Sequence, residues 1–435
     1  MASRFADVKL GPPIEVFAVN KACVDDPHPD KINMTVGAYR DDEGKPWVLP
    51  VVRKTERAMA DDCTLNHEYL PVLGLEAFSS AATGMLLGPD HPAVAEGRAF
   101  GVQTLSGTGA LRVGAEFLTR QLKYSTFYMS NPSWGNHKLV FLNAGFAECR
   151  EYRYWDAAGR TVDFAGLLED LRAAPENAVV ILHACAHNPT GCDPSREQWE
   201  QIADVMKEKK LFPFFDSAYQ GFASGDLDKD AWAVRYFAGR GFEFVCAQSF
   251  AKNFGLYNER VGNLTMVLND KQLVPQVKSQ VTLIVRGMYS NPPNHGGRIV
   301  ATVLNNPQLF EEWCVSLSLT LSRSPSLAPS LAPSLPPSLP PSRPLSLANL
   351  HSRPLLLSLA LSRSLLLSLY FSLSLSLSAL CAVRVSHRDT VNLVVYTFQG
   401  ANRYRPEKFA NSLRDRLKYK SLYLSAASAI GSQLT

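Results

Sequence analysis

The sequence predicts an α/β fold with a largely parallel sheet over the first three quarters of the chain. Short apolar runs alternate with helical patterns, for example the pattern 197–209 before the apolar run that starts at Leu211. Several of these runs end in polar residues that suit a binding site. In open α/β sheets such residues gather at the carboxyl edge of the strands, so we expect the functional site there.

Length and composition agree with a soluble enzyme in the first three quarters of the chain, and the cysteines indicate a cytosolic protein. The chain has 435 residues, enough for two domains with a sizeable core. Its net charge of +4 is slight and no basic block interleaves with aromatic residues, so we expect no nucleic-acid partner. The eight cysteines form no CxxC pair, and the first residues are neither apolar nor rich in arginine. We therefore predict reduced thiols and no targeting peptide.

The most informative segment is 242–262, where an apolar run ends in Ser249 and Lys252 and Arg260 follows. A lysine at the end of a buried strand is partly desolvated, which disfavours the ammonium form and leaves an amine nucleophile. Ser249 and Arg260 are suited to an anion such as phosphate. The segment predicts a Schiff-base pocket for a phosphorylated aldehyde.

Two further apolar runs supply groups that a pyridine ring needs. Asp216 ends the run 211–216, and a carboxylate at the ring nitrogen lets such a ring accept carbanion charge. Tyr219 follows three residues later, and Asn188 lies in the turn after the run 178–183. Both side chains are placed to reach a phenolic oxygen on the ring.

A phosphate cradle is predicted at residues 105–118. Ser106, Gly107, Thr108 and Gly109 open a helical pattern there. Free backbone N–H groups and the dipole at the start of such a helix attract an anion.

Each feature also has a structural interpretation. Taken alone, Lys252 is interpreted as a surface lysine, and Asp216 is interpreted as a residue that forms a turn or caps a helix. His183 and His187 read as hydrogen-bonded core groups, with no carboxylate at ligand spacing, so no metal site is predicted. The combination of features at strand ends, in this order, favours the cofactor site.

Residues 1 to about 313 resemble the aspartate aminotransferase family, cytosolic type, among the fold-type I pyridoxal-phosphate enzymes. The resemblance lies in residues 36–42, 65–74, 106–109, 183–191, 214–225 and 249–260. It implies a homodimeric enzyme that transfers an amino group between L-aspartate and 2-oxoglutarate through a Schiff base with pyridoxal 5'-phosphate. The substrates are then dicarboxylic amino acids and 2-oxo acids.

The resemblance also implies roles for single residues. Lys252 forms the Schiff base and moves the substrate's α-proton, and Asp216, supported by His137, partners the ring nitrogen. The other implied cofactor contacts are Ser106, Gly107, Thr108, Ser249 and Arg260 at the phosphate, Asn188 and Tyr219 at the phenolic oxygen, Trp134 on the ring face, and Tyr69 from the neighbouring subunit. The implied catalytic residues are Lys252, Asp216, Tyr219 and Trp134, and the implied substrate contacts are Gly37, Trp134, Asn188 and Arg286.

Arg286 is the residue that implies dicarboxylic substrates. A guanidinium binds a carboxylate bidentately, and the family's arginine does so across the dimer interface. Without the family context, Arg286 reads as a partner in an ordinary helix salt bridge. An aromatic aminotransferase or a decarboxylase is disfavoured, because Arg286 and the Asn291-Pro-Pro context point to dicarboxylates.

The resemblance divides the chain into an N-terminal arm (1–11), a partial small domain (12–45) and a large pyridoxal-phosphate domain (46–313). From 315 to 383 the sequence is rich in Ser, Leu and Pro with almost no charge. We interpret this low-complexity segment as a translated intron or a gene-prediction error, since a repeated CT dinucleotide encodes Ser-Leu. The alternatives are a disordered linker or a membrane insert at Ser364–Val383. Residues 384–435 form an unassigned tail.

This segment replaces the second half of the family's small domain. The family's arginine for the substrate α-carboxylate lies there in a Pro-Ser-Gly-Arg context, and no arginine of this tail matches it. Three hypotheses for the function remain: a working aspartate aminotransferase, a chain that binds pyridoxal phosphate but is catalytically impaired, and a membrane-tethered form without activity.

Overall fold

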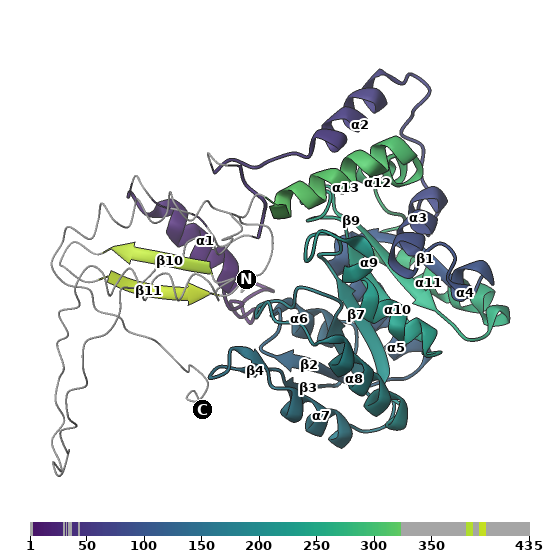
Figure 1. Cartoon of the computed structure of the whole chain (residues 1–435). Coiled ribbons are helices and arrows are strands. Elements are labelled where there is room, and N and C mark those ends of the chain that lie inside the picture. Colours follow the sequence, from purple (N-terminus) through teal and green to yellow (C-terminus); the bar gives the residue numbers. More distant parts are fainter. Residues whose placement is uncertain are drawn as a thin grey trace, which may run out of the picture. The chain divides into compact units, whose positions relative to one another are not determined.

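The computed structural model describes residues 3–28, 31, 33, 37–41, 44–322, 380–385 and 391–396 (Figure 1). The strands are β1 (Ala99–Leu105), β2 (Thr126–Asn131), β3 (Glu148–Arg153), β4 (Trp155–Asp156), β5 (Thr161–Val162), β6 (Val179–His183), β7 (Phe212–Ser217), β8 (Phe244–Ser249), β9 (Val261–Val267), β10 (Leu380–Val385) and β11 (Val391–Tyr396). The helices are α1 (Glu15–Asp25), α2 (Pro50–Asp61), α3 (Glu76–Leu87), α4 (Pro92–Ala95), α5 (Ser106–Gln121), α6 (Asn136–Asn143), α7 (Phe164–Ala173), α8 (Arg196–Glu208), α9 (Leu227–Asp230), α10 (Trp232–Gly239), η1 (Lys271–Leu273), α11 (Val274–Met288), α12 (Asn294–Asn305) and α13 (Pro307–Ser322).

The central sheet has seven strands in the order β1-β9-β8-β7-β6-β2-β3. Strands β8, β7, β6, β2 and β3 pair in parallel. Strand β9 pairs antiparallel with β1 and β8, so it runs against the rest of this sheet. This architecture confirms the predicted fold class, a mostly parallel sheet flanked by helices.

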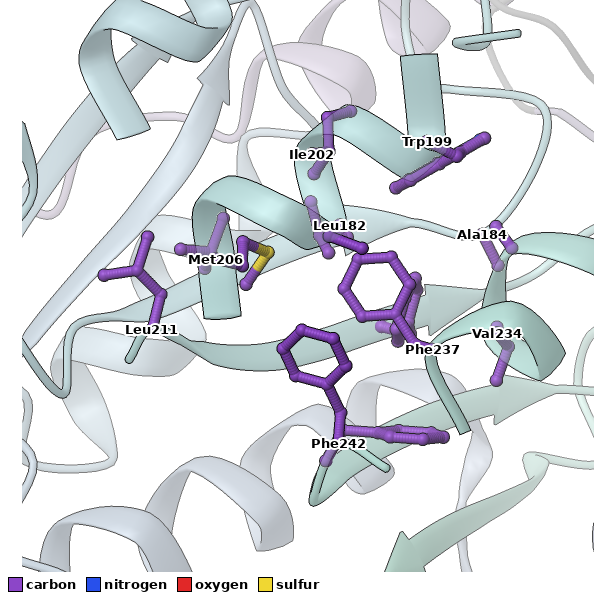
Figure 2. Packing of buried hydrophobic residues seen from close by; sticks show 14 of the residues in the cluster. Leu182, Ala184, Trp199, Ile202, Met206, Leu211, Val234, Phe237 and Phe242 are labelled. Atoms are coloured by element: carbon purple, nitrogen blue, oxygen red, sulfur yellow. The ribbon is translucent and has the colours of Figure 1, made fainter. Parts of the chain in front are cut away.

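Helices cover both faces of the sheet. Val180 and Leu182 of β6 pack on one face with α7, α8 and α10, and Val179 and Ile181 pack on the other with α5, α6 and α11. Figure 2 shows the first face, where Leu182 lies close to the aromatic ring of Phe237. Strands buried on both faces have continuous apolar sequences, which leaves the strand ends for polar groups.

A third apolar cluster joins α2, α3, α12 and α13 to the turn after β8. Trp313 of α13 is fully buried there and stacks on Phe254 with ring centroids 4.5 Å apart. The helix continues to Ser322, past the predicted start of the Ser/Leu-rich segment at 315. Leu317 is 1% exposed and belongs to the same cluster. The first residues of that segment are therefore part of the folded core.

Strands β10 and β11 form an antiparallel hairpin, with Leu380 opposite Tyr396. The hairpin holds the end of the 315–383 segment and part of the tail. Residues 364–379 of the stretch considered as a membrane insert lie outside the described residues, and residues 380–383 belong to β10. Among the described helices, none has both the length and the apolar character of a membrane span.

Candidate active site

The polar residues that end the apolar strands meet at one edge of the sheet. Leu105, the last residue of β1, pairs with Val261, and Ser249, the last residue of β8, pairs with Gly262. Because β9 runs against β1 and β8, its first residues lie at their carboxyl ends. The reversed direction of β9 thereby brings Arg260, which precedes it, to the same edge.

Ser106, Ser249 and the backbone of Arg260 meet at this edge. The Oγ atoms of Ser106 and Ser249 lie 3.3 Å apart, and the Ser106 N–H donates to the Arg260 carbonyl at 2.9 Å. Ser106 and Arg260 adopt the left-handed conformation, with φ of 64° and 55°, which is uncommon for residues other than glycine. Ser106 also opens α5, which no side chain of the described residues caps. Apart from the Ser106 N–H, the N–H groups of the first turn of α5 and its positive dipole end are therefore open to an anion.

Two glycines allow the backbone to close around this arrangement. A Cβ atom added at Gly107 would lie 2.9 Å from the Cβ of Ser249. A Cβ atom added at Gly262 would lie 2.2 Å from the carbonyl carbon of Ser106. Neither approach is possible for a larger residue without a shift of the backbone. The close packing of Ser106, Gly107, Ser249 and Gly262 therefore requires glycine at positions 107 and 262.

Asp216 lies at the end of β7 in a chain of hydrogen bonds. Its Oδ2 lies 2.8 Å from Nε2 of His137, and Nδ1 of His137 lies 3.0 Å from Oγ of Ser133. The same Oγ is 3.4 Å from Nε2 of His183, the residue that pairs with Asp216 across the strands. His137 is fully buried, whereas the Asp216 side chain remains 13% exposed. His137 therefore holds one oxygen of the carboxylate, and part of the Asp216 side chain remains accessible at the sheet edge.

The electrostatics of this chain keep Asp216 ionised. Burial raises the pKa of Asp216, but the hydrogen bond and charge of His137, with the charge of Lys252, lower it by more, so the pKa lies below its ordinary value. Burial lowers the pKa of His183 to about 3, which keeps that ring neutral at physiological pH. A carboxylate of this kind is suited to hold a proton on a ring nitrogen.

Lys252 lies in the turn after β8, partly buried beside Tyr219. Its Nζ atom is 5.4 Å from the centre of the Tyr219 ring. Burial lowers the pKa of Lys252, the charge of Arg260 lowers it further, and Asp216 opposes both. Burial raises the pKa of Tyr219, so its phenol stays protonated. The site therefore holds an amine biased toward its nucleophilic form.

Trp134 and Asn188 lie next to the histidine chain. The Trp134 ring meets the His137 ring edge to face, with centroids 5.2 Å apart, and both side chains follow β2. The backbone N–H of Asn188 donates to Nδ1 of His183 at 3.0 Å. Both residues are partly exposed.

Tyr69, Gly37 and Arg286 make no hydrogen bond or ion pair with Lys252, Asp216 or Ser106 in the part of the chain that the structure describes. Tyr69 is 83% exposed, and Gly37 lies in a partly exposed loop in which the Tyr39 N–H donates to the Tyr257 hydroxyl at 2.9 Å. Arg286 is exposed at the end of α11 and donates to Ser290. No carboxylate of the described residues forms an ion pair with Arg286, so the alternative of a helix salt bridge is not observed there.

Sequence reasoning missed several residues that support the site. Ser133 bridges two histidines, and Gly262 permits the approach of β9 to Ser106. Asn253 and Trp313 hold the Lys252 turn from behind. Ser133 stands four residues before His137, a spacing that predicts a local hydrogen bond, whereas the other three depend on contacts between distant segments.

Comparison with known proteins gives the same assignment. The sequence profile of the family described as "Aminotransferase class I and II" matches residues 29–324. The cytoplasmic aspartate aminotransferase of Gallus gallus is 59% identical over 317 residues, 72% of this chain and 77% of that protein. The structure of the aspartate aminotransferase from Saccharomyces cerevisiae cytoplasm matches with a TM-score of 0.71 and 41% identity, over 73% of this chain and 80% of that chain.

A further solved structure bears on the cofactor. It is an aromatic-amino-acid aminotransferase from Burkholderia pseudomallei, covalently bound to pyridoxal phosphate, with a TM-score of 0.71, 41% identity, and coverage of 73% of this chain and 79% of that chain. Taken with the family match over most of the chain, these likenesses show that the chain belongs to the class I and II aminotransferases and is a pyridoxal-phosphate-dependent transaminase.

Proposed function

We propose that this chain transfers an amino group between L-aspartate and 2-oxoglutarate, giving oxaloacetate and L-glutamate. The observation that carries the proposal is the common edge at which three features meet. These are the desolvated amine of Lys252, the ionised carboxylate of Asp216, and the anion cradle around Ser106. The high identity to cytoplasmic aspartate aminotransferases supports aspartate as the substrate.

The residues at this edge fit pyridoxal 5'-phosphate. We assign the phosphate to the start of α5 (Ser106, Gly107, Thr108) with Ser249 and Arg260. The two glycine contacts support this assignment, because they let Ser249 and the start of β9 approach the first turn of α5 closely. We assign the ring nitrogen to Asp216, the ring face to Trp134, and the phenolic oxygen to Asn188 and Tyr219. When bound, the cofactor supplies a protonated ring that accepts the electron pair left on the substrate's α-carbon.

The chain's own groups carry the proton transfers. The neutral amine of Lys252 accepts the α-proton of the amino acid and returns a proton on the other side of the exchange. Its lowered pKa supports this role, because a base must be unprotonated near neutral pH to act. The negative charge of Asp216 keeps a proton on the ring nitrogen, and His137 fixes the orientation of that carboxylate.

Recognition of the substrate side chain is assigned to Arg286, with Gly37 beside the bound substrate. Arg286 is exposed and, apart from its hydrogen bond to Ser290, its guanidinium has no carboxylate partner among the described residues, which supports a role in binding a dicarboxylate. Because Arg286 and Tyr69 make no hydrogen bond or ion pair with Lys252 or Asp216 among the described residues, we propose that each serves the site of a second copy. The active unit is then a homodimer.

We place the enzyme in the cytoplasm. The support is the naming of its relatives in animals and plants as cytoplasmic aspartate aminotransferases. Cell fractionation followed by immunodetection of the chain tests the location, and recovery of the chain with organelle membranes would contradict it.

The reaction is tested with the purified 435-residue chain, L-aspartate and 2-oxoglutarate. We expect oxaloacetate to form only when pyridoxal 5'-phosphate is supplied. Lys252→Ala should abolish the activity, whereas Lys271→Ala, at an exposed lysine of η1, should leave it unchanged. A chain that binds the cofactor through Lys252 and yet forms no oxaloacetate would refute the proposed reaction.

A further inference from the structure

Asn253 links two turns of the site: the turn after β8, which holds Lys252, and the turn after β7, which holds Tyr219. The side-chain Nδ2 of Asn253 donates to the backbone carbonyl of Gln220 at 3.1 Å. Asn253 directly follows Lys252, and Gln220 directly follows Tyr219. Both Asn253 and Gln220 are 2% exposed, so water does not compete for this bond.

The Gln220 side of this link is itself anchored. Its Nε2 atom donates to the carbonyl of Met85 at 3.0 Å and to that of Leu227 at 3.2 Å. These bonds tie the Tyr219 turn to α3 and α9. The turn therefore offers a fixed acceptor to Asn253.

The Lys252 side is anchored by α13. The indole Nε1–H of Trp313 donates to the backbone carbonyl of Asn253 at 2.9 Å, and the indole stacks on Phe254. Leu317 lies one helical turn after Trp313 and packs against Gly221, the residue that follows Gln220. A Cβ atom added at Gly221 would lie 2.7 Å from Cδ1 of Leu317.

We propose that Trp313, Asn253, Gln220 and Leu317 form a clamp that sets the separation between the amine of Lys252 and the phenol of Tyr219. These are positioning residues, since they act through the backbone of the two turns. The clamp gives a function to the start of the Ser/Leu-rich segment, because Leu317 belongs to it. The inference rests on the proposed role of Lys252 as the cofactor-binding amine.

The clamp predicts that a small change on α13 alters the environment of Lys252. The charged and titratable groups around this amine are Asp216 from β7, Tyr219 from the following turn, and Arg260, which directly precedes β9. A turn released from Trp313 exposes the amine to water and lets it move away from these groups. Its reactivity as an amine then falls toward that of a surface lysine.

The test uses the full chain and three variants. Trp313→Phe removes the indole N–H but keeps a ring on Phe254, and Asn253→Ala removes the donor to Gln220. Val315→Ala is the matched control, because Val315 lies on the same helix and is 50% exposed. Two quantities are measured: the dissociation constant of pyridoxal 5'-phosphate, and the rate at which cyanate carbamoylates Lys252 of the cofactor-free chain, followed by mass spectrometry between pH 7 and 10.

We expect Trp313→Phe and Asn253→Ala to weaken cofactor binding by roughly threefold to tenfold, the range for one hydrogen bond. Both should shift the pH profile of carbamoylation toward that of an exposed lysine, while Val315→Ala matches the wild type. Unchanged binding and an unchanged profile in both variants, with the same thermal unfolding as the wild type, would overturn the clamp. Thermal unfolding also identifies a variant that fails to fold, and the remaining variant then decides.

The failure of the proposed function has a different signature. If Lys252→Ala binds pyridoxal 5'-phosphate as tightly as the wild type, Lys252 is not the cofactor-binding amine. If the wild type shows Lys252-dependent binding that the clamp variants do not alter, only the clamp is refuted.

Discussion

The Nε2 atom of His137 lies 2.8 Å from the Oδ2 atom of Asp216, and the histidine is fully buried while the carboxylate reaches the sheet edge. This contact fixes the orientation of the carboxylate and helps to keep it ionised. It also connects the site to the interior, since His137 is bonded through Ser133 to His183.

Asp216→Asn should lower the rate of amino transfer by at least about a hundredfold, because an amide holds no proton on a ring nitrogen. The measurement is kcat with L-aspartate at saturating cofactor. Asp204→Asn is the control, since Asp204 is exposed and pairs only with Arg240 among the described residues. A variant with near-normal kcat would show that Asp216 does not face the reacting ring.

Arg286→Leu should raise KM for L-aspartate by about tenfold to a thousandfold, because the side-chain carboxylate loses a charged partner. The rate with L-phenylalanine should change much less. The measurement is kcat/KM for both substrates, with Arg53→Leu, on the exposed surface of α2, as the control. Equal losses for both substrates would indicate a structural role for Arg286.

Much of the site was predictable because parallel strands buried on both faces leave polar groups only at their ends. Asp216, Ser249 and Lys252 each follow a mostly apolar run, so the sequence alone predicts that they lie at one edge of the sheet. The small residues after Leu105 likewise predicted an anion site at the start of a helix.

The remaining features depend on pairing between distant segments. The reversed direction of β9 brings Arg260 and Gly262 to Ser106, and an apolar run carries no information about its direction in a sheet. The burial of Leu317 was also missed, because a Ser-Leu alternation has the period of a strand, whereas α13 continues through it. There the helix is held by packing on Gly221 and its neighbours, which overrides the local pattern.

Gly262→Ala should weaken binding of pyridoxal 5'-phosphate, because the added methyl group would displace Ser106 from its left-handed conformation. Overpacking of this kind costs about 1–3 kcal/mol, which corresponds to roughly fivefold to a hundredfold in affinity. The measurement is the dissociation constant of the cofactor, together with thermal unfolding of the cofactor-free chain. Gly239→Ala is the control, since a Cβ atom there meets nothing within 4 Å. Equal affinity in the Gly262 variant would show that the cradle tolerates a shift at Ser106.

Acid should destabilise the cofactor-free chain in a way that depends on His183. Its folded pKa is about 3 against an ordinary value of 6.5, so between these two pH values the unfolded chain binds a proton that the folded chain excludes. The free energy of unfolding therefore falls as the pH is lowered from about 6.5 toward 3, by up to a few kcal/mol for this group. His183→Asn, which keeps an acceptor near the Asn188 N–H, should make this decline shallower. The measurement is urea unfolding at pH 7, 5.5 and 4.5, with His295→Asn as an exposed control.

His187 has a pKa lowered in the same direction by burial, so some dependence of stability on acid should remain in the His183 variant. An acid slope equal to that of the wild type would mean that His183 is not held neutral in the folded chain.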